Sequence, residues 1–267
     1  MLRIGAHVGK DGDGPDPVTE AIARKADVVQ FFLGDPQSYK GPVLPDDADS
    51  LVARAADAGI DLYVHAPYPI NVATVNNRVR IPGRKLLAQH AEAAASLGAK
   101  AVIVHGGHLG KGDDPDAGYA NWRKTFDRWT PPLPVLIENT AGGDNAMARR
   151  FDRLARLWDA LEGCPNVDKV GFCLDTCHAH AGGEELLGIV DRVKAITGRI
   201  DLIHANGSKD AFDSGRDRHE NFAAGLIEAQ AIVAVVESAG APVVCETPGG
   251  AEGQSADIAF LRDRLPA

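Results

Sequence analysis

Residues 170–183 read V-G-F-C-L-D-T-C-H-A-H-A-G-G, and within this stretch an apolar run gives way to residues that can bind metals. The run V-G-F-C-L is continuously apolar, which is typical of a strand buried on both faces. It ends abruptly at Asp175, and His178 follows three residues later. A carboxylate at a strand end and an imidazole in the next turn can converge on one point above a sheet. For these two residues alone, a metal or phosphate site and an ordinary helix-capping loop are equally good interpretations.

The same pattern recurs along the chain, where short apolar runs end in a metal-competent side chain. The six residues that end such runs are His65, His105, Glu138, Asp175, His204 and Glu246. Buried strands ordinarily end in turn-forming residues, and glutamate is depleted in strands. Six endings of this kind indicate that the strand ends face a common centre.

Strands and helices are expected to alternate throughout. The predicted strands are 2–6, 28–33, 61–65, 101–105, 135–139, 170–175, 200–205 and 242–246. The predicted helices are 18–26, 46–58, 83–97, one ending near 129, 151–161, 184–196, 226–238 and 255–265. This alternation over roughly 250 residues predicts a single (β/α)8 barrel domain, residues 1–267, with a metal site at the C-terminal strand ends. An open, doubly wound sheet is less favoured because no G-x-G-x-x-G follows the first strand.

Composition fits this architecture. The chain has 267 residues, of which 45% are hydrophobic and 24% charged, enough for one sizeable core. No apolar stretch of about 18 residues and no signal-type N-terminal region occurs, so we expect a soluble, cytoplasmic protein without membrane contact. No surplus amphipathic helix is evident, which favours a monomer. The cysteines have no disulfide-framework spacing and are expected to be reduced core residues: Cys164, Cys173, Cys177 and Cys245.

The net charge of −9 argues against a simple nucleic-acid binder, which would show a basic footprint. Three bound divalent ions would nevertheless add six positive charges and change the balance from −9 to −3. Basic residues also stand beside the motifs, namely Arg78, Arg80, Arg84, Lys85, Arg149, Arg150, Lys209, Arg216 and Arg218. Taken singly, each is equally well explained as a solvated surface charge.

With His178 and the D-R-H segment, the chain offers five imidazoles and four carboxylates as metal ligands. Asp217 and His219 of that segment would project to one side of an extended backbone. Nine ligands are too many for one zinc ion, which takes about four, and suit two or three ions. Mixed imidazole and carboxylate ligation favours zinc and leaves manganese and iron open. A multinuclear cluster of this kind clamps a phosphate and activates water, so phosphoester hydrolysis is the natural reaction.

The other histidines have plainer interpretations. His90 lies in an alanine-rich helix and is expected at the surface, and His180 is expected to pack within a loop. His7 and His108 could contact a substrate or a ligand, or serve as structural histidines.

In combination, the motifs resemble those of the endonuclease IV family, the zinc-dependent apurinic/apyrimidinic endonucleases, over essentially the whole chain. The motifs are G-A-H-V at 5–8, V-H-A-P-Y at 64–68, V-H-G-G-H at 104–108, I-E-N-T-A-G at 137–142, C-L-D-T-C-H at 173–178, D-R-H at 217–219 and C-E-T at 245–247.

The resemblance implies a trinuclear zinc site. One ion would be held by His65, His105 and Glu138. Glu138 would bridge to a second ion, shared with Asp175, His204 and Glu246. The third would be held by His178, Asp217 and His219.

It also implies cleavage of duplex DNA 5′ to abasic sites, leaving a 3′-hydroxyl and a 5′-deoxyribose phosphate, and repair of blocked 3′ ends. Glu138 and Glu246 would be the catalytic residues. DNA contacts would come from Tyr68, Gln37, Arg218 and Lys209.

The chain departs from the family pattern at three places. Gly207 stands where the seventh-strand motif carries an acidic residue, N-F-A-A-G-L-I at 221–227 replaces a glycine-rich segment, and Pro69 replaces a larger apolar residue. Two alternatives to the nuclease stay open. One is a xylose-isomerase-like sugar or sugar-phosphate isomerase or epimerase, which would use Glu138, Asp175, His204 and Glu246 for a single ion. The other is a damaged-DNA binder with weak catalysis.

Overall fold

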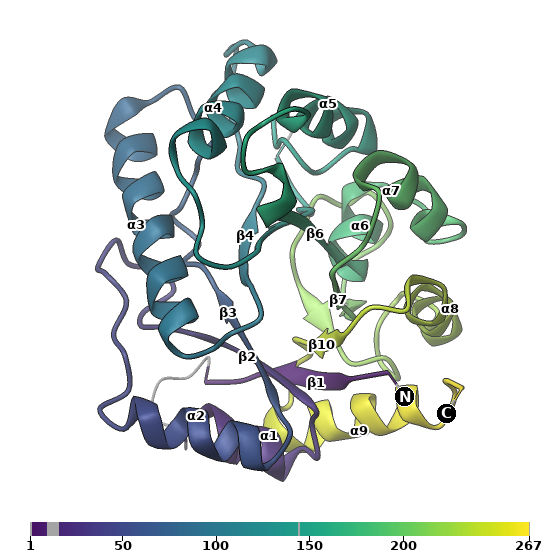
Figure 1. Ribbon diagram of the computed structural model, residues 1–267. Coiled ribbons are helices and arrows are strands. Elements are labelled where there is room, and N and C mark those ends of the chain that lie inside the picture. The colour runs from purple at the N-terminus through teal and green to yellow at the C-terminus, as the bar shows by residue number, and fades with distance from the viewer. Residues whose placement is uncertain (1, 10–15, 144, 267) are drawn as a thin grey trace.

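The computed structural model describes residues 2–9, 16–143 and 145–266, and it confirms the predicted (β/α)8 barrel (Figure 1). Eight parallel strands close in the order β1-β10-β7-β6-β5-β4-β3-β2. They are β1 Ile4–His7, β2 Val28–Phe32, β3 Asp61–His65, β4 Val102–His105, β5 Val135–Glu138, β6 Val170–Asp175, β7 Leu202–His204 and β10 Val243–Cys245. The remaining two, β8 Gly207–Ser208 and β9 His219–Glu220, form a separate antiparallel pair.

Helices form the outer ring around the strands (Figure 1). They are α1 Pro17–Ala23, α2 Ala48–Asp57, α3 Asn77–Ser96, α4 Pro115–Arg128, α5 Phe151–Leu161, α6 Thr176–Gly182, α7 Ile189–Thr197, α8 Ala229–Ala239 and α9 Gly250–Arg262, with a 3-10 turn at Val167–Lys169. Within the described ranges, no helix combines the length and apolarity needed to cross a lipid bilayer.

The alternation of side chains along each strand decides what enters the barrel. One residue from nearly every strand joins an apolar cluster inside it, namely Val28, Tyr63, Ile103, Leu136, Cys173, Leu202 and Val244. Side chains two residues apart on a strand point to the same face. The residue two places further on therefore also points inward, at the C-terminal mouth. This is where Glu138, Asp175 and His204 lie, all fully buried.

Some predicted element boundaries were wrong. The stretch after β6 was expected to be a turn, but it forms the short helix α6, because the Asp175 side chain caps it by accepting from His178 N at 2.7 Å. Helix α3 begins at Asn77 and not at residue 83, and it accommodates Pro82 inside it. The pair β8–β9 lies between the predicted strand 200–205 and the predicted helix 226–238, where neither a strand nor a helix was expected.

The cysteines behave as predicted. All four are free and buried. Burial raises the pKa of Cys173 and of Cys177 to about 12, so both thiols stay protonated at neutral pH.

His90 does not lie at the surface as predicted, because it is only 2% exposed on the inner side of α3. Neither ring nitrogen has a hydrogen-bond partner among the described residues. Burial lowers the pKa of His90 to about 4, because a charged imidazole would be desolvated there. His90 is therefore a neutral core residue.

This burial predicts a pH-dependent loss of stability. Between pH 6.5 and about 4 the unfolded chain binds a proton at His90 that the folded chain excludes, so stability falls as the pH falls. One such group contributes a slope of at most about 1.4 kcal/mol per pH unit. His90→Leu should remove that slope in urea unfolding measured from pH 7 to pH 4. Parallel pH profiles for the two proteins would contradict it.

Candidate metal centre

Among the described residues, donor atoms gather in three main groups at the C-terminal mouth of the barrel. The first contains His65, His105 and Glu138, and its ligand atoms all lie within 4.8 Å of one another. His65 Nε2 is 3.1 Å and His105 Nε2 is 3.4 Å from Glu138 Oε2. His65 Nδ1 lies 2.8 Å from Ala66 O and can donate to it, so Nε2 is the ring nitrogen that faces Glu138.

All four members of the second group are buried, and one of them also belongs to the first group. It consists of Glu138, Asp175, His204 and Glu246, again with donor atoms within 4.8 Å. His204 Nδ1 lies 3.0 Å from Glu138 Oε1, 3.9 Å from Asp175 Oδ2 and 3.6 Å from Glu246 Oε2. Glu138 is thus the one residue common to both groups.

The third group brings together α6 and the segment leading into β9. His178 Nε2 lies 3.1 Å and His219 Nε2 lies 3.2 Å from Asp217 Oδ1. Both Nε2 atoms are buried and have no well-directed hydrogen bond within the described part of the chain. His178 Nδ1 lies 2.9 Å from Asn139 O and can donate to it, so its Nε2 is the nitrogen that faces the group.

These donor sets fit divalent ions. Ligand atoms on one tetrahedral zinc lie roughly 3–4 Å apart, since each stands about 2.0–2.2 Å from the ion. The distances between nitrogen and oxygen in the three groups, from 3.0 to 3.9 Å, match that spacing. A further grouping, Asp175, Cys177 and His219, takes Asp175 from the second group and His219 from the third.

Four carboxylates packed among five imidazoles shift one another's protonation. Burial tends to raise the pKa of Glu138, but His204 and His105 outweigh it and hold that pKa well below its ordinary value. Burial tends to lower the pKa of His178, yet Asp175 and Asp217 raise it well above 6.5. The pocket thus draws positive charge toward its carboxylates, and incoming divalent ions would displace protons.

The buried side-chain amides of Asn139 and Asn206 form hydrogen bonds with candidate ligands, and the sequence had not pointed to them. Asn139 and Asp175 form reciprocal bonds, with Asn139 Nδ2 donating to Asp175 O at 2.9 Å and Asp175 N donating to Asn139 Oδ1 at 2.8 Å. Asn206 Nδ2 donates to Asp175 Oδ2 at 2.7 Å, and Glu246 N donates to Asn206 Oδ1 at 2.8 Å. An asparagine directly after Glu138, or two residues after His204, is the signal that could have revealed them.

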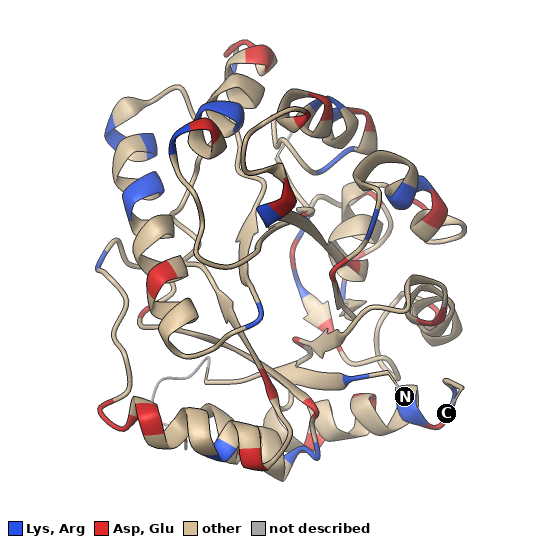
Figure 2. Ribbon diagram, viewed as in Figure 1, with Lys and Arg blue, Asp and Glu red and all other residues tan. Residues whose placement is uncertain are grey.

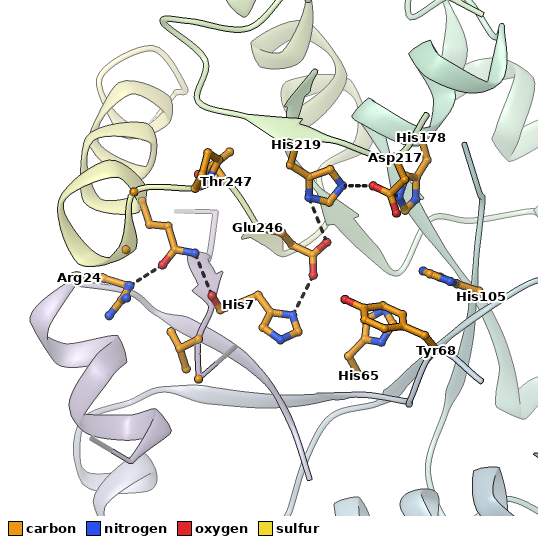
Figure 3. Close-up of a pocket in the computed structure, with 16 residues that line it drawn as sticks. His7, Arg24, His65, Tyr68, His105, His178, Asp217, His219, Glu246 and Thr247 are labelled. Carbon is orange, nitrogen blue, oxygen red and sulfur yellow. Dashed lines mark hydrogen bonds and ion pairs between the residues drawn. The ribbon is translucent and has the colours of Figure 1, made fainter. Parts of the chain in front are cut away.

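The groups open into a cavity of about 590 Å³ (Figure 3). Its lining includes His65, His105, His178, Asp217, His219 and Glu246. Glu246 stands between His7 and His219, while the Tyr68 ring lies over His65 beside His105 (Figure 3). Tyr68 is 42% exposed, with its ring centroid 5.7 Å from that of His105 and 5.8 Å from that of His65. An aromatic face is therefore available next to the donor groups.

The other predicted DNA contacts lie on exposed segments outside this lining. Gln37 is exposed in the loop after β2. Arg218 makes a bidentate ion pair with Asp210, with Nε donating to Oδ2 at 2.7 Å and Nη2 to Oδ1 at 2.5 Å. Lys209 Nζ is 3.8 Å from Glu220 Oε2.

The remaining histidines divide as follows. His7 is buried, with Nδ1 2.8 Å from Glu246 Oε1, so it contacts a candidate ligand. His180 lies in α6, not in a loop, and its Nε2 is 3.2 Å from Asp210 O. His108 is exposed and pairs through its backbone with Ala146.

Steric crowding explains why residue 207 is a glycine. It pairs with Glu220 in the β8–β9 hairpin, and a Cβ at this position would lie 2.7 Å from Glu220 O. The segment between these strands carries Asp217, and it is tied down elsewhere: Arg149 and Arg150 both donate to Asp213 Oδ1, at 3.0 and 2.7 Å. Gly207 therefore allows the β8–β9 pairing that holds the segment with Asp217, a member of the third donor group.

Fold and site together define a metal-competent barrel of the xylose-isomerase type. A family model described as xylose isomerase-like TIM barrel matches residues 18–264. The "Probable endonuclease 4" of Mycobacterium leprae is 55% identical over 263 residues, covering 98% of this chain and 99% of the relative, and that of Mycobacterium marinum is 53% identical over 264 residues. The chain belongs to the endonuclease IV family.

Solved structures show the same relationship. Endonuclease IV from Thermus thermophilus superposes with a TM-score of 0.81 at 26% identity and covers 98% of both chains. A D-tagatose 3-epimerase-like protein gives a TM-score of 0.78 at 16% identity, which reflects the shared fold alone.

The hairpin geometry predicts the effect of introducing the acidic residue of the family pattern. Gly207→Asp should lower the free energy of unfolding by about 1–3 kcal/mol, because the new Cβ crowds the Glu220 carbonyl in a packed site. Gly41→Asp is the matched control, since a Cβ there meets only Gln89 Oε1 at 3.8 Å. Urea unfolding of both variants checks this, and equal stabilities would show that the hairpin tolerates a side chain.

Proposed function

We propose that this chain is a DNA-repair hydrolase that cuts the phosphodiester 5′ to abasic sites in duplex DNA, leaving a 3′-hydroxyl and a 5′-deoxyribose phosphate. The same site would remove blocking groups from 3′ ends. The protein would act as a cytoplasmic monomer holding three zinc ions, with manganese as an alternative metal. The observation that carries the proposal is the presence of three donor groups around one cavity, two of them sharing Glu138.

Each donor group would hold one ion. Ions at these positions would polarise a phosphate and make water a stronger nucleophile at neutral pH. Glu138 would keep neighbouring ions together, because its two oxygens face different groups: Oε2 toward His65 and His105, and Oε1 toward His204. In the hydrolysis, water adds to phosphorus, the bond from phosphorus to the 3′-oxygen breaks, and that oxygen leaves as a hydroxyl.

Glu246 would orient the water and accept its proton. It lines the cavity, and its Oε1 is held by Gln30 Nε2 at 2.9 Å. Its Oε2 lies 3.6 Å from His204 Nδ1 and 3.8 Å from His219 Nδ1, between the second and third donor groups. A carboxylate fixed at one oxygen can act as a base through the other.

Tyr68 and the basic residues of α3 would bind the DNA. The exposed face of the Tyr68 ring can stack on a sugar or base displaced from the duplex. In Figure 2, α3, which follows the loop carrying Tyr68, carries several basic residues beside the acidic Glu92, and α2 carries mostly acidic residues beside Arg54. The cations on α3 are Arg78, Arg80, Arg84 and Lys85. They and the ions would offset the net charge of −9 near the cavity.

A sugar isomerase is the second candidate, favoured by the shared barrel and by the quartet around His204. A single ion would use that quartet and leave His65, His105, His178, Asp217 and His219 without a role. The relatives at 55% identity over nearly the whole chain are named as endonucleases. These facts support the nuclease.

The first test is incision of a duplex carrying one tetrahydrofuran abasic analogue. We expect a single cut 5′ to the analogue, a 3′-hydroxyl product, and loss of activity in a strong chelator that added zinc restores. The undamaged duplex is the control. Tight binding of the damaged duplex without incision in zinc or manganese would instead select the damage-binding alternative.

Removing a ligand of the third donor group tests whether that group contributes to incision. His178→Ala should lower the kcat of incision at least about 100-fold, a loss typical of deleting an essential ligand or catalytic group. Ketose epimerisation, the reaction expected of the isomerase alternative, should be absent from both the wild-type protein and the variant. His108→Ala is the control, because this exposed histidine belongs to none of the three groups. Equal incision rates for the two variants would rule out a role for the third group.

A further inference from the structure

Gln30 is buried at the centre of the site and had no role in the sequence analysis. It lies on β2, two residues after the inward-facing Val28, and none of its surface is exposed. Strand alternation therefore directs its amide into the barrel at the level of the donor groups. A buried amide is tolerated there only when its donors and its acceptor are satisfied.

All polar atoms of this amide are engaged by residues of the site. Gln30 Nε2 donates to Glu246 Oε1 at 2.9 Å and lies 2.8 Å from His7 Nδ1. Gln30 Oε1 lies 2.9 Å from His204 Nε2. One side chain thus joins two members of the second donor group, the imidazole of His204 and the carboxylate of Glu246.

These contacts fix which nitrogen of His204 can bind a metal. A carboxylate oxygen only accepts hydrogen bonds, so Gln30 must present its NH2 to Glu246 and its carbonyl oxygen to His204. His204 must then carry a proton on Nε2 to donate to that oxygen. In a neutral ring this leaves the lone pair on Nδ1, the nitrogen 3.0 Å from Glu138 Oε1 and 3.6 Å from Glu246 Oε2.

We propose that Gln30 is a positioning residue that sets the metal affinity of the second donor group, by selecting the Nδ1-ligating form of His204 and holding Glu246 at the same time. The inference rests on the proposed metal-dependent function. Outer hydrogen-bond partners of metal ligands typically alter metal affinity by about 10–100-fold.

The test is competitive zinc titration of metal-free protein against a chromophoric chelator. Gln30→Met keeps the length of the side chain but removes both hydrogen bonds, and should weaken one of three binding steps at least about 10-fold. Gln30→Glu can still accept from His204 but places a second carboxylate against Glu246, so it should not restore the affinity. Asn121→Leu is the matched control: this buried amide on α4 bonds to Ala73 O, Thr74 O and Arg80 and touches no candidate ligand.

A merely structural role for Gln30 predicts a different result. Gln30→Met would then lower the urea stability of the metal-free protein, as Asn121→Leu should, without changing any zinc-binding step, and that outcome would overturn the inference. If Gln30→Met fails to fold, the zinc-loaded wild-type protein decides the question by ¹⁵N NMR, since the inference requires the His204 proton on Nε2. Wild-type protein that binds no zinc at the second group would instead refute the proposed function.

Discussion

A buried carboxylate, Glu138, joins the two inner donor groups, and the rest of the site is arranged around it. Its Oε2 faces imidazoles from β3 and β4, and its Oε1 faces the imidazole of His204 on β7. A carboxylate with no exposed surface is costly unless positive charge compensates it. Imidazoles and divalent ions are the compensation available, and the inward-facing positions of a closed parallel barrel are what bring them to one point.

The alternation of apolar runs with helical segments predicted the barrel, and residues of metal-ligand type at the ends of those runs indicated where donors would converge. An apolar residue facing inward, followed two places later by His, Asp or Glu, is readable wherever the strand is regular, as in L-I-E at Glu138. Gln30 obeys the same period, yet glutamine is not a metal-ligand type, so the pattern passed over it. Only the folded chain shows that its amide lies between two ligands.

Features that depend on tertiary contacts were not predictable in this way. Helix α6 has seven residues and is supported by its Asp175 cap, so local propensity gave little signal. The β8–β9 pair has two residues per strand and is tied down by ion pairs between distant residues, such as Arg150 with Asp213. His90 was misjudged because the alanines around it make both faces of α3 look alike, so periodicity could not identify the buried face.

The donors beyond the quartet of Glu138, Asp175, His204 and Glu246 come from β3, β4, α6, β9 and the segment before β9, and a single bound ion would leave them unused. The most direct measurement is therefore the zinc content of the purified protein, determined by elemental analysis alongside Glu138→Gln. Three ions per wild-type chain, with at least one lost in the variant, is the predicted result. One ion per wild-type chain would contradict the account and favour the isomerase.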